Sequence, residues 1–235
     1  MKTVILCGGY GSRLSEETKV KPKPLVEIGG KAILWHIMKI YNFYGVNNFI
    51  LATGYKSKMI KDYIKKSSFS GMNIKSVYTG KNTNTGGRLL KLRKLFKPNE
   101  NFFFTYGDGV TNLNIKKTLD FHIRNNTIAT VTAVRPPVRF GELQIKRNTV
   151  TSFKEKIQSS ANWISGGYFV LNYKVFDYIS SNKTIFEKET LKRIVQLKAL
   201  KAYKHYSFWQ CMDTLRDKNV LNNLWKKKIA PWKTW

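Results

Sequence analysis

Short apolar runs alternate with segments of helical periodicity along the first 135 residues of the chain. Thr3–Cys7, Asn48–Thr53 and Phe102–Tyr106 are apolar runs of strand length. Lys31–Tyr44 repeats its apolar residues at helical spacing and stops at Gly45, a residue typical of helix ends. The same pattern predicts strands at Asn73–Tyr78 and Ala129–Arg135, and helices at Ser57–Lys66, Gly86–Phe96 and Ile115–Asn125. Such alternation predicts an α/β fold, in which helices flank a mixed, mostly parallel sheet.

The alternation changes after Pro136 and Pro137. Gly141–Ile145 and Val150–Lys156 predict a hairpin, and Gly167–Leu171 predicts a further strand. Helices are predicted at Val175–Ile179, Phe186–Lys198 and Thr214–Lys227, and a late strand leads toward Asp213. No linker, repeat or low-complexity tract separates the parts. We therefore expect one domain, residues 1–235, made of two halves on the same sheet, about 1–135 and about 136–235.

The charge of the chain is strongly positive, with 42 Lys and Arg against 14 Asp and Glu and a net charge of +28. Nucleic acids and anionic membranes are the partners that such a balance first suggests. The lysines are dispersed, however, as in Lys56–Lys66, and no nucleic-acid motif accompanies them. The pattern predicts a solvated basic surface, without a nucleic-acid or membrane partner. No run of about 18 apolar residues predicts a membrane span.

The two cysteines, Cys7 and Cys211, are too few for a disulfide framework. They predict buried, reduced thiols and a cytoplasmic protein. No Cys/His spacing is typical of a zinc site.

A cluster of glycines follows the first apolar run, in "ILCGGYGSRL". Glycines after a strand expose backbone N–H groups to which an anion can come close. The cluster lacks the third glycine of the dinucleotide fingerprint and the Gly-Lys-Ser/Thr of the P-loop. It has instead Arg13, a planar fork of donors, and Lys23, held between Pro22 and Pro24. Two cations on a glycine loop predict a site for a triphosphate.

The following segment, "SEETKVKPKPLVEIGGKAILWHIMKIY", resembles the glucose-1-phosphate cytidylyltransferase family of sugar-1-phosphate nucleotidylyltransferases. The likeness covers nearly the whole chain, through "TGGRLLKL", "FFFTYGDGV", "RFGELQI", "FKEK", "GGYFVLN" and "FWQCMDTLRDK" to "APWKTW". The glycine-arginine motif alone is common to the superfamily. The segment that begins with "SEET" and the segment "FWQCMDTLRDK" are far more specific to the family. The resemblance implies the Rossmann-like nucleotide-diphospho-sugar transferase fold, with a nucleotide-binding first half and a sugar-binding second half.

The reaction that the resemblance implies joins CTP and α-D-glucose 1-phosphate into CDP-glucose and diphosphate. A phosphate monoester has a second pKa of about 6, so the sugar phosphate is an anion and needs no general base. Catalysis should then consist of in-line positioning and neutralisation of charge, with Mg²⁺ as cofactor. The resemblance also implies a cytoplasmic homo-oligomer that serves deoxysugar and polysaccharide biosynthesis.

The resemblance implies a role for each matching residue of this sequence. It implies that Asp108 and Asp213, each after a strand, bind the metal and act in catalysis with Arg13 and Lys23. The nucleotide would be bound by Leu6, Gly8, Gly9, Gly11, Ser12, Arg13, Lys23, Thr83, Arg88 and Gly107. The sugar phosphate would be bound by Gly141, Glu155 and Lys156.

The sequence departs from the family pattern at three positions and in one length. Ser12 replaces a threonine, Ile157 a proline and Ser165 an asparagine, and the segment between Lys66 and Asn73 is short. Ile157 and Ser165 lie near the predicted sugar-binding side. The segment between Lys66 and Asn73 corresponds to one that takes part in subunit contacts and covers the site in the family. Two alternatives therefore stay open: a nucleotidylyltransferase for another sugar 1-phosphate or nucleotide, and a non-catalytic regulatory relative.

Overall fold

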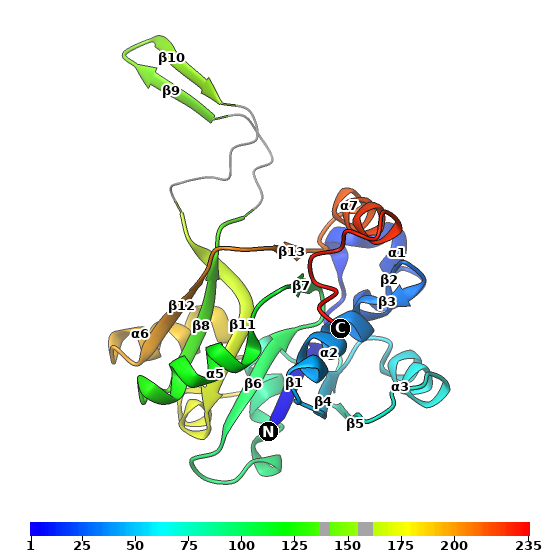
Figure 1. The fold of residues 1–235 in the computed structure, drawn as a ribbon. Helices are drawn as coiled ribbons and strands as arrows, with labels where there is room; N and C mark the ends of the chain where they lie inside the picture. Colours follow the sequence, from blue (N-terminus) through cyan, green and yellow to red (C-terminus); the bar gives the residue numbers. More distant parts are fainter. Residues whose placement is uncertain (137–141, 155–161) are drawn as a thin grey trace.

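A seven-stranded sheet forms the centre of the molecule in the computed structural model, which describes residues 1–136, 142–154 and 162–235 (Figure 1). Its strands, in spatial order, are β12 (Leu200–His205), β8 (Ala129–Val134), β11 (Ile164–Asn172), β6 (Asn101–Tyr106), β1 (Lys2–Cys7), β4 (Asn48–Thr53) and β5 (Asn73–Tyr78). Only β11 runs antiparallel to its neighbours β6 and β8. The predicted fold class, a mixed and mostly parallel sheet flanked by helices, is confirmed.

Two apolar clusters cover the two faces of this sheet. Along β1, Ile5 and Cys7 belong to one cluster, and Val4 and Leu6 to the other, as the alternation of side chains along a strand requires. The first cluster includes residues of helices α2 (Ile33–Phe43), α3 (Ser57–Lys66), α5 (Ile115–Arg124) and α7 (Leu215–Lys226). The second includes residues of α4 (Thr85–Leu90), η4 (Tyr173–Tyr178), η5 (Phe186–Thr190) and α6 (Leu191–Gln196). Both faces of the central strands are buried, which explains why β1, β4 and β6 read as nearly continuous apolar runs.

The structure corrects three predicted helices. Helix α2 begins at Ile33 instead of Lys31, because β3 (Lys31–Ala32) pairs with β2 (Glu27–Ile28). The helix predicted over Gly86–Phe96 is α4 followed by a separate 3₁₀ turn, η3 (Arg93–Leu95). The helix predicted from Phe186 opens with the π turn η5 and ends at Gln196. In each case the apolar periodicity was real, but strand pairing, a tighter 3₁₀ turn or a wider π turn divided the segment.

Three groups of smaller elements surround the sheet. The strands β9 (Glu142–Lys146) and β10 (Thr149–Lys154) form a hairpin that stands apart from the sheet in Figure 1. Short turns η1 (Ser12–Leu14), α1 (Ser15–Thr18) and η2 (Lys23–Leu25) follow β1. Strands β7 (Gly109–Thr111) and β13 (Trp209–Cys211) pair antiparallel, and Thr214 and Asp217 then form a capping box at the start of α7.

An aromatic cluster attaches the C-terminal segment to α2. His36 and Trp232 are both fully buried, and Trp232 Nε1 donates to His36 Nδ1 at 3.3 Å. Nδ1 is therefore the acceptor, so Nε2 carries the proton and donates to the carbonyl oxygen of Ile28 at 2.9 Å. Trp225 lies edge-on to His36 at 4.7 Å between ring centroids. Burial lowers the pKa of His36 to about 4, so the imidazole is neutral near pH 7.

Within the described residues, none of the helices has the length and apolar character needed to cross a membrane.

Candidate active site

A pocket of about 540 Å³ opens at the carboxyl ends of β1 and β6. These strands are neighbours in the sheet, but the chain runs from β1 outward to β4 and β5 before it returns to β6. Ligands of open α/β sheets bind at such a reversal of strand order. The pocket lies where the fold predicts a ligand site.

The glycine loop after β1 forms one wall of this pocket. Gly8 lies directly against Arg88, because a Cβ at this position would be 2.3 Å from Arg88 Nη1. Nothing lies within 4 Å of the point where Gly9 would carry a Cβ, and Gly11 has a φ of 68°, which favours glycine. The loop thus presents bare backbone to the pocket, as a close approach of phosphate requires.

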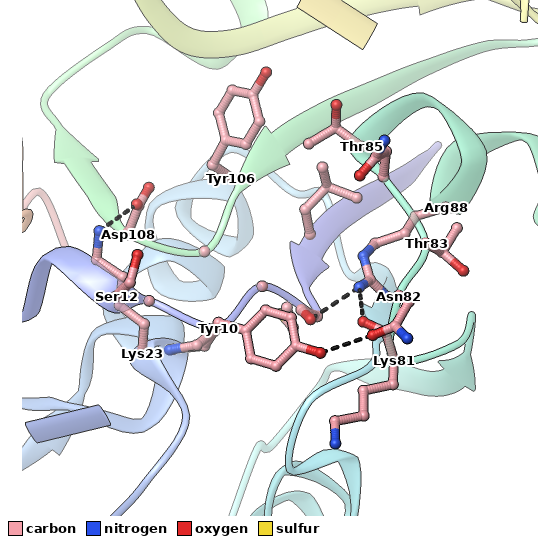
Figure 2. A pocket seen from close by; sticks show the side chains of 18 of the residues that line it. Tyr10, Ser12, Lys23, Lys81, Asn82, Thr83, Thr85, Arg88, Tyr106 and Asp108 are labelled. Carbon is pink, nitrogen blue, oxygen red and sulfur yellow. Dashed lines mark hydrogen bonds and ion pairs between the residues drawn. The ribbon is translucent and has the colours of Figure 1, made fainter. Parts of the chain in front are cut away.

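Arg88 holds the glycine loop in place through hydrogen bonds. Its guanidinium is buried and donates to the carbonyl oxygens of Gly8, Thr53, Gly80 and Lys81 and to Thr79 Oγ1, at 2.7 to 3.2 Å. Figure 2 shows Arg88 at the end of the pocket opposite Lys23 and Asp108. Arg88 therefore ties the loops after β1, β4 and β5 together; its contact with a nucleotide stays a prediction.

Lys23 occupies the space between the two predicted metal ligands. Its Nζ lies 2.7 Å from Asp108 Oδ2 and 2.5 Å from Asp213 Oδ1, and the residue is only 8% exposed. Arg13 Nη1 lies 2.5 Å from the other oxygen of Asp213. Burial alone would lower the pKa of Lys23, but the charge of Asp108 and hydrogen bonds to both acids hold it above its ordinary value. Burial opposes ionisation of Asp213, yet its pKa is lowered by Lys23 and Arg13.

Pairing of β7 with β13 brings the two acids together across 105 positions of sequence. Cys211 lies opposite Gly109, and the backbone N–H of Met212 donates to the carbonyl oxygen of Asp108 at 2.8 Å. Carboxylate oxygens suit Mg²⁺, so the donors present fit the ion that the sequence predicts. One ligand atom from each of Asp108, Cys211 and Asp213 lies within 4.8 Å of the others.

The half-buried thiol of Cys211 is therefore part of the acid cluster, which the sequence analysis did not foresee. Burial raises the pKa of Cys211, and the thiol is neutral as the structure stands. The only signal in the sequence was that Cys211 stands two residues before Asp213.

Most of the residues implied by the resemblance line this one pocket. They are Leu6, Gly8, Gly9, Gly11, Ser12, Arg13, Lys23, Thr83, Arg88, Gly107 and Asp108. Asp213 joins them through its ion pairs to Lys23 and Arg13. Gly141, Glu155 and Lys156, predicted for the sugar phosphate, lie outside the described residues.

Three further hydrogen bonds at the pocket were not predicted. Tyr10 donates to Asn82 Oδ1 at 2.7 Å, which links the glycine loop to the loop before α4 (Figure 2). On the other side, Glu187 of η5 accepts hydrogen bonds from Tyr106 and from Thr85 Oγ1. No local sequence pattern marks these pairs, because they join segments 72 to 102 positions apart.

The fold and the site together define a transferase of nucleotidyl groups. The family model described as nucleotidyl transferase matches residues 2–217, and the chain belongs to that family. Within it, the chain is 48% identical to the glucose-1-phosphate cytidylyltransferase of Salmonella typhimurium, and 41% identical to the probable glucose-1-phosphate cytidylyltransferase of Bacillus subtilis. Both alignments cover 100% of this chain and of the relative. The resemblance inferred from the motifs is confirmed.

Solved structures agree with this assignment of fold. HddC from Yersinia pseudotuberculosis, complexed with GMP-PN, superposes with a TM-score of 0.76 at 25% identity, covering 95% of this chain and 99% of that one. A putative glucose-1-phosphate thymidylyltransferase from Bacillus anthracis gives 0.75 at 19% identity, covering 95% and 94%. The second likeness supports the fold alone.

Proposed function

We propose that this chain is a cytidylyltransferase that joins CTP and α-D-glucose 1-phosphate into CDP-glucose and releases diphosphate. One observation carries the proposal. Lys23, Arg13 and the Asp108–Asp213 pair converge beside a glycine loop at the carboxyl ends of β1 and β6. The identity of 48% over the full length of a curated relative supports the choice of CTP and glucose 1-phosphate.

The residues divide the chemistry between binding and neutralisation. An oxygen of the sugar phosphate attacks the α-phosphorus of CTP, and the bond to the β-phosphate oxygen breaks as diphosphate leaves. The obstacle is repulsion between two anions, so fixed positive charge lowers the barrier. Arg13 offers two or more donors to phosphate oxygens, and Lys23 a point charge at the pocket floor. The backbone of Leu6, Gly8 and Gly9 forms the wall for the nucleoside.

Mg²⁺ is the implied cofactor, and Asp108 and Asp213 would hold it. The ion would supply charge neutralisation on the phosphate oxygens that it contacts. Lys23 bonds to both acids in the structure, so its ammonium has to turn toward the phosphates when the nucleotide and the ion enter. This exchange would place Lys23 against the reacting phosphate.

The proposal also includes the location, the oligomeric state and the pathway of the enzyme. We expect a cytoplasmic homo-oligomer that feeds deoxysugar and polysaccharide biosynthesis, as the resemblance of the sequence motifs to the cytidylyltransferase family implies. Light scattering on the purified chain measures the oligomeric state, and a monomer at micromolar concentration contradicts that part.

A substrate matrix tests the reaction. Diphosphate release is measured for CTP, UTP, dTTP and GTP with several sugar 1-phosphates. CTP with glucose 1-phosphate should give the highest kcat/KM. Preference for another pair assigns the chain to a different nucleotidylyltransferase, such as one using a guanine nucleotide, since HddC was solved with GMP-PN. Nucleotide binding without any turnover indicates a non-catalytic regulatory relative.

Replacement of the acids tests the site itself. Asp108→Asn and Asp213→Asn should each lower kcat/KM by about 100-fold or more, because each removes one of the two carboxylates that would hold Mg²⁺ at the reacting phosphates. Asp120→Asn is the matched control, since Asp120 lies exposed on α5. Equal activity of all three variants contradicts the placement of the site.

A further inference from the structure

The sulfur of Cys211 lies beside the two carboxylates because of backbone pairing. β13 runs antiparallel to β7, and Cys211, its last residue, is opposite Gly109, the residue after Asp108. The sulfur of Cys211 lies within 4.8 Å of a carboxylate oxygen of each of Asp108 and Asp213. The thiol is therefore held in register with Asp108 and Asp213.

A cation already occupies the space that these groups surround. The Lys23 ammonium bridges Asp108 Oδ2 and Asp213 Oδ1 at 2.7 and 2.5 Å, and its side chain is 10% exposed. A buried ammonium held by two carboxylates shows that positive charge is stabilised at this point. A divalent cation that displaces Lys23 would meet the same two oxygens, and it would also lie near a sulfur.

The separation of the three donor atoms suits a small tetrahedral ion. Around zinc, with bonds of about 2.1 to 2.3 Å, neighbouring ligand atoms lie about 3.6 Å apart. The donors of Asp108, Cys211 and Asp213 are all within 4.8 Å of one another, so side-chain movements of about an ångström would close them around such an ion. Mg²⁺ prefers oxygen ligands and has little affinity for sulfur, whereas Zn²⁺, Cd²⁺ and Co²⁺ accept thiolate ligands.

We propose that Asp108, Cys211 and Asp213 form a three-ligand site for thiophilic divalent cations, Zn²⁺ and Cd²⁺ among them, at the place where the carboxylates would hold Mg²⁺. The cation takes the thiol as a thiolate, and the proton passes to the solvent. The two ions then compete for Asp108 and Asp213, so Zn²⁺ displaces Mg²⁺ and inhibits nucleotidyl transfer. The proposal rests on the position of the magnesium site in the proposed function. The spacing of Cys and His in the sequence did not indicate this site, because two of its three ligands are carboxylates.

Spectroscopy with the metal alone tests the site without reference to turnover. The full-length chain is titrated with Co²⁺ in the absence of nucleotide, and the sulfur-to-cobalt charge-transfer band in the near ultraviolet is recorded. The wild type should develop this band at one equivalent of Co²⁺. Cys211→Ser should lose the band and bind Zn²⁺ at least tenfold more weakly by calorimetry.

Cys7→Ser is the matched control, because Cys7 is fully buried on β1 and is not a member of the acid cluster. It should keep both the band and the Zn²⁺ affinity. Asp213→Asn should weaken the band although both cysteines remain.

Two results overturn the proposal. One is a Cys211→Ser variant, folded by circular dichroism, that binds Zn²⁺ as tightly as the wild type. The other is a wild type that gives no sulfur-to-cobalt band, which requires no variant to fold. Magnesium-dependent turnover of wild type with CTP is measured separately. A sulfur band without turnover rejects the proposed function alone, and turnover without the band rejects this inference alone.

Discussion

The neutral His36 predicts how the stability of the protein changes with pH. In an unfolded chain the imidazole has a pKa of about 6.5, whereas burial beside Trp225 and Trp232 lowers it to about 4, although the hydrogen bond to the carbonyl oxygen of Ile28 acts in the opposite direction. The folded state therefore binds the proton less readily than the unfolded state. The contribution of His36 to stability is complete above pH 6.5 and is lost as the pH falls toward 4.

The expected loss follows from these two pKa values. Each pH unit between them corresponds to about 1.4 kcal/mol, so full protonation costs about 3.4 kcal/mol. At pH 5 the loss from His36 alone is about 2 kcal/mol, because the unfolded imidazole is almost fully protonated there and the folded one is mostly neutral. A loss of this size is a substantial part of the stability of an ordinary domain.

Denaturation by urea at pH 7, 6 and 5 measures the loss. His36→Gln is the informative variant, because its side-chain amide can still donate to Ile28 but does not titrate. Its free energy of unfolding should be lower than that of the wild type at pH 7, and should fall about 2 kcal/mol less between pH 7 and pH 5. His122, whose pKa burial also lowers to about 4, is present in both proteins, so its contribution cancels. Parallel pH profiles for the two proteins would refute the reasoning.

Two further substitutions test the binding pocket. Lys23→Met removes the ammonium that bridges the two acids, so Mg²⁺ alone should bind more tightly in calorimetry. The same variant should lower kcat by about 100-fold or more, because it removes a positive charge beside the phosphates. Weaker Mg²⁺ binding would show that Lys23 does not compete with the ion. In the Arg88→Lys variant the lysine side chain cannot reach all five acceptors that the guanidinium contacts. The free energy of unfolding should therefore fall by about 2–4 kcal/mol in urea denaturation, and CTP should bind more weakly. Unchanged stability would mean that these bonds do not hold the glycine loop.

Local sequence patterns were sufficient for most of the sheet and for several helices. β4, α3 and β5 have the predicted bounds, because each is a periodic segment between turn residues. The errors lie where distant segments interact. Lys31–Ala32 continues the helical pattern, yet pairs with Glu27–Ile28 as a strand. The π turn at Phe186–Thr190 likewise depends on packing against α4, since Thr85 accepts the N–H of Phe186.

The candidate site was predictable in its residues but not in their arrangement. Arg13, Lys23, Asp108 and Asp213 were all implied by motifs, and the structure brings the four together. The ion pairs among them could not be read from the sequence, because they depend on the register of β7 with β13. The same register places Cys211 in the cluster, and no motif contains that information.

The pairing of β7 with β13 also affects how the site comes into being during synthesis. The glycine loop, Lys23 and Asp108 lie in the first half of the sequence, but Asp213, which follows β13, is made 105 residues after Asp108. On the ribosome, a growing chain that ends before β13 has one acid of the pair beside Lys23 and lacks the other. Such a nascent chain cannot assemble the cation site, so competence for catalysis would arise only after β13 and Asp213 have been synthesised.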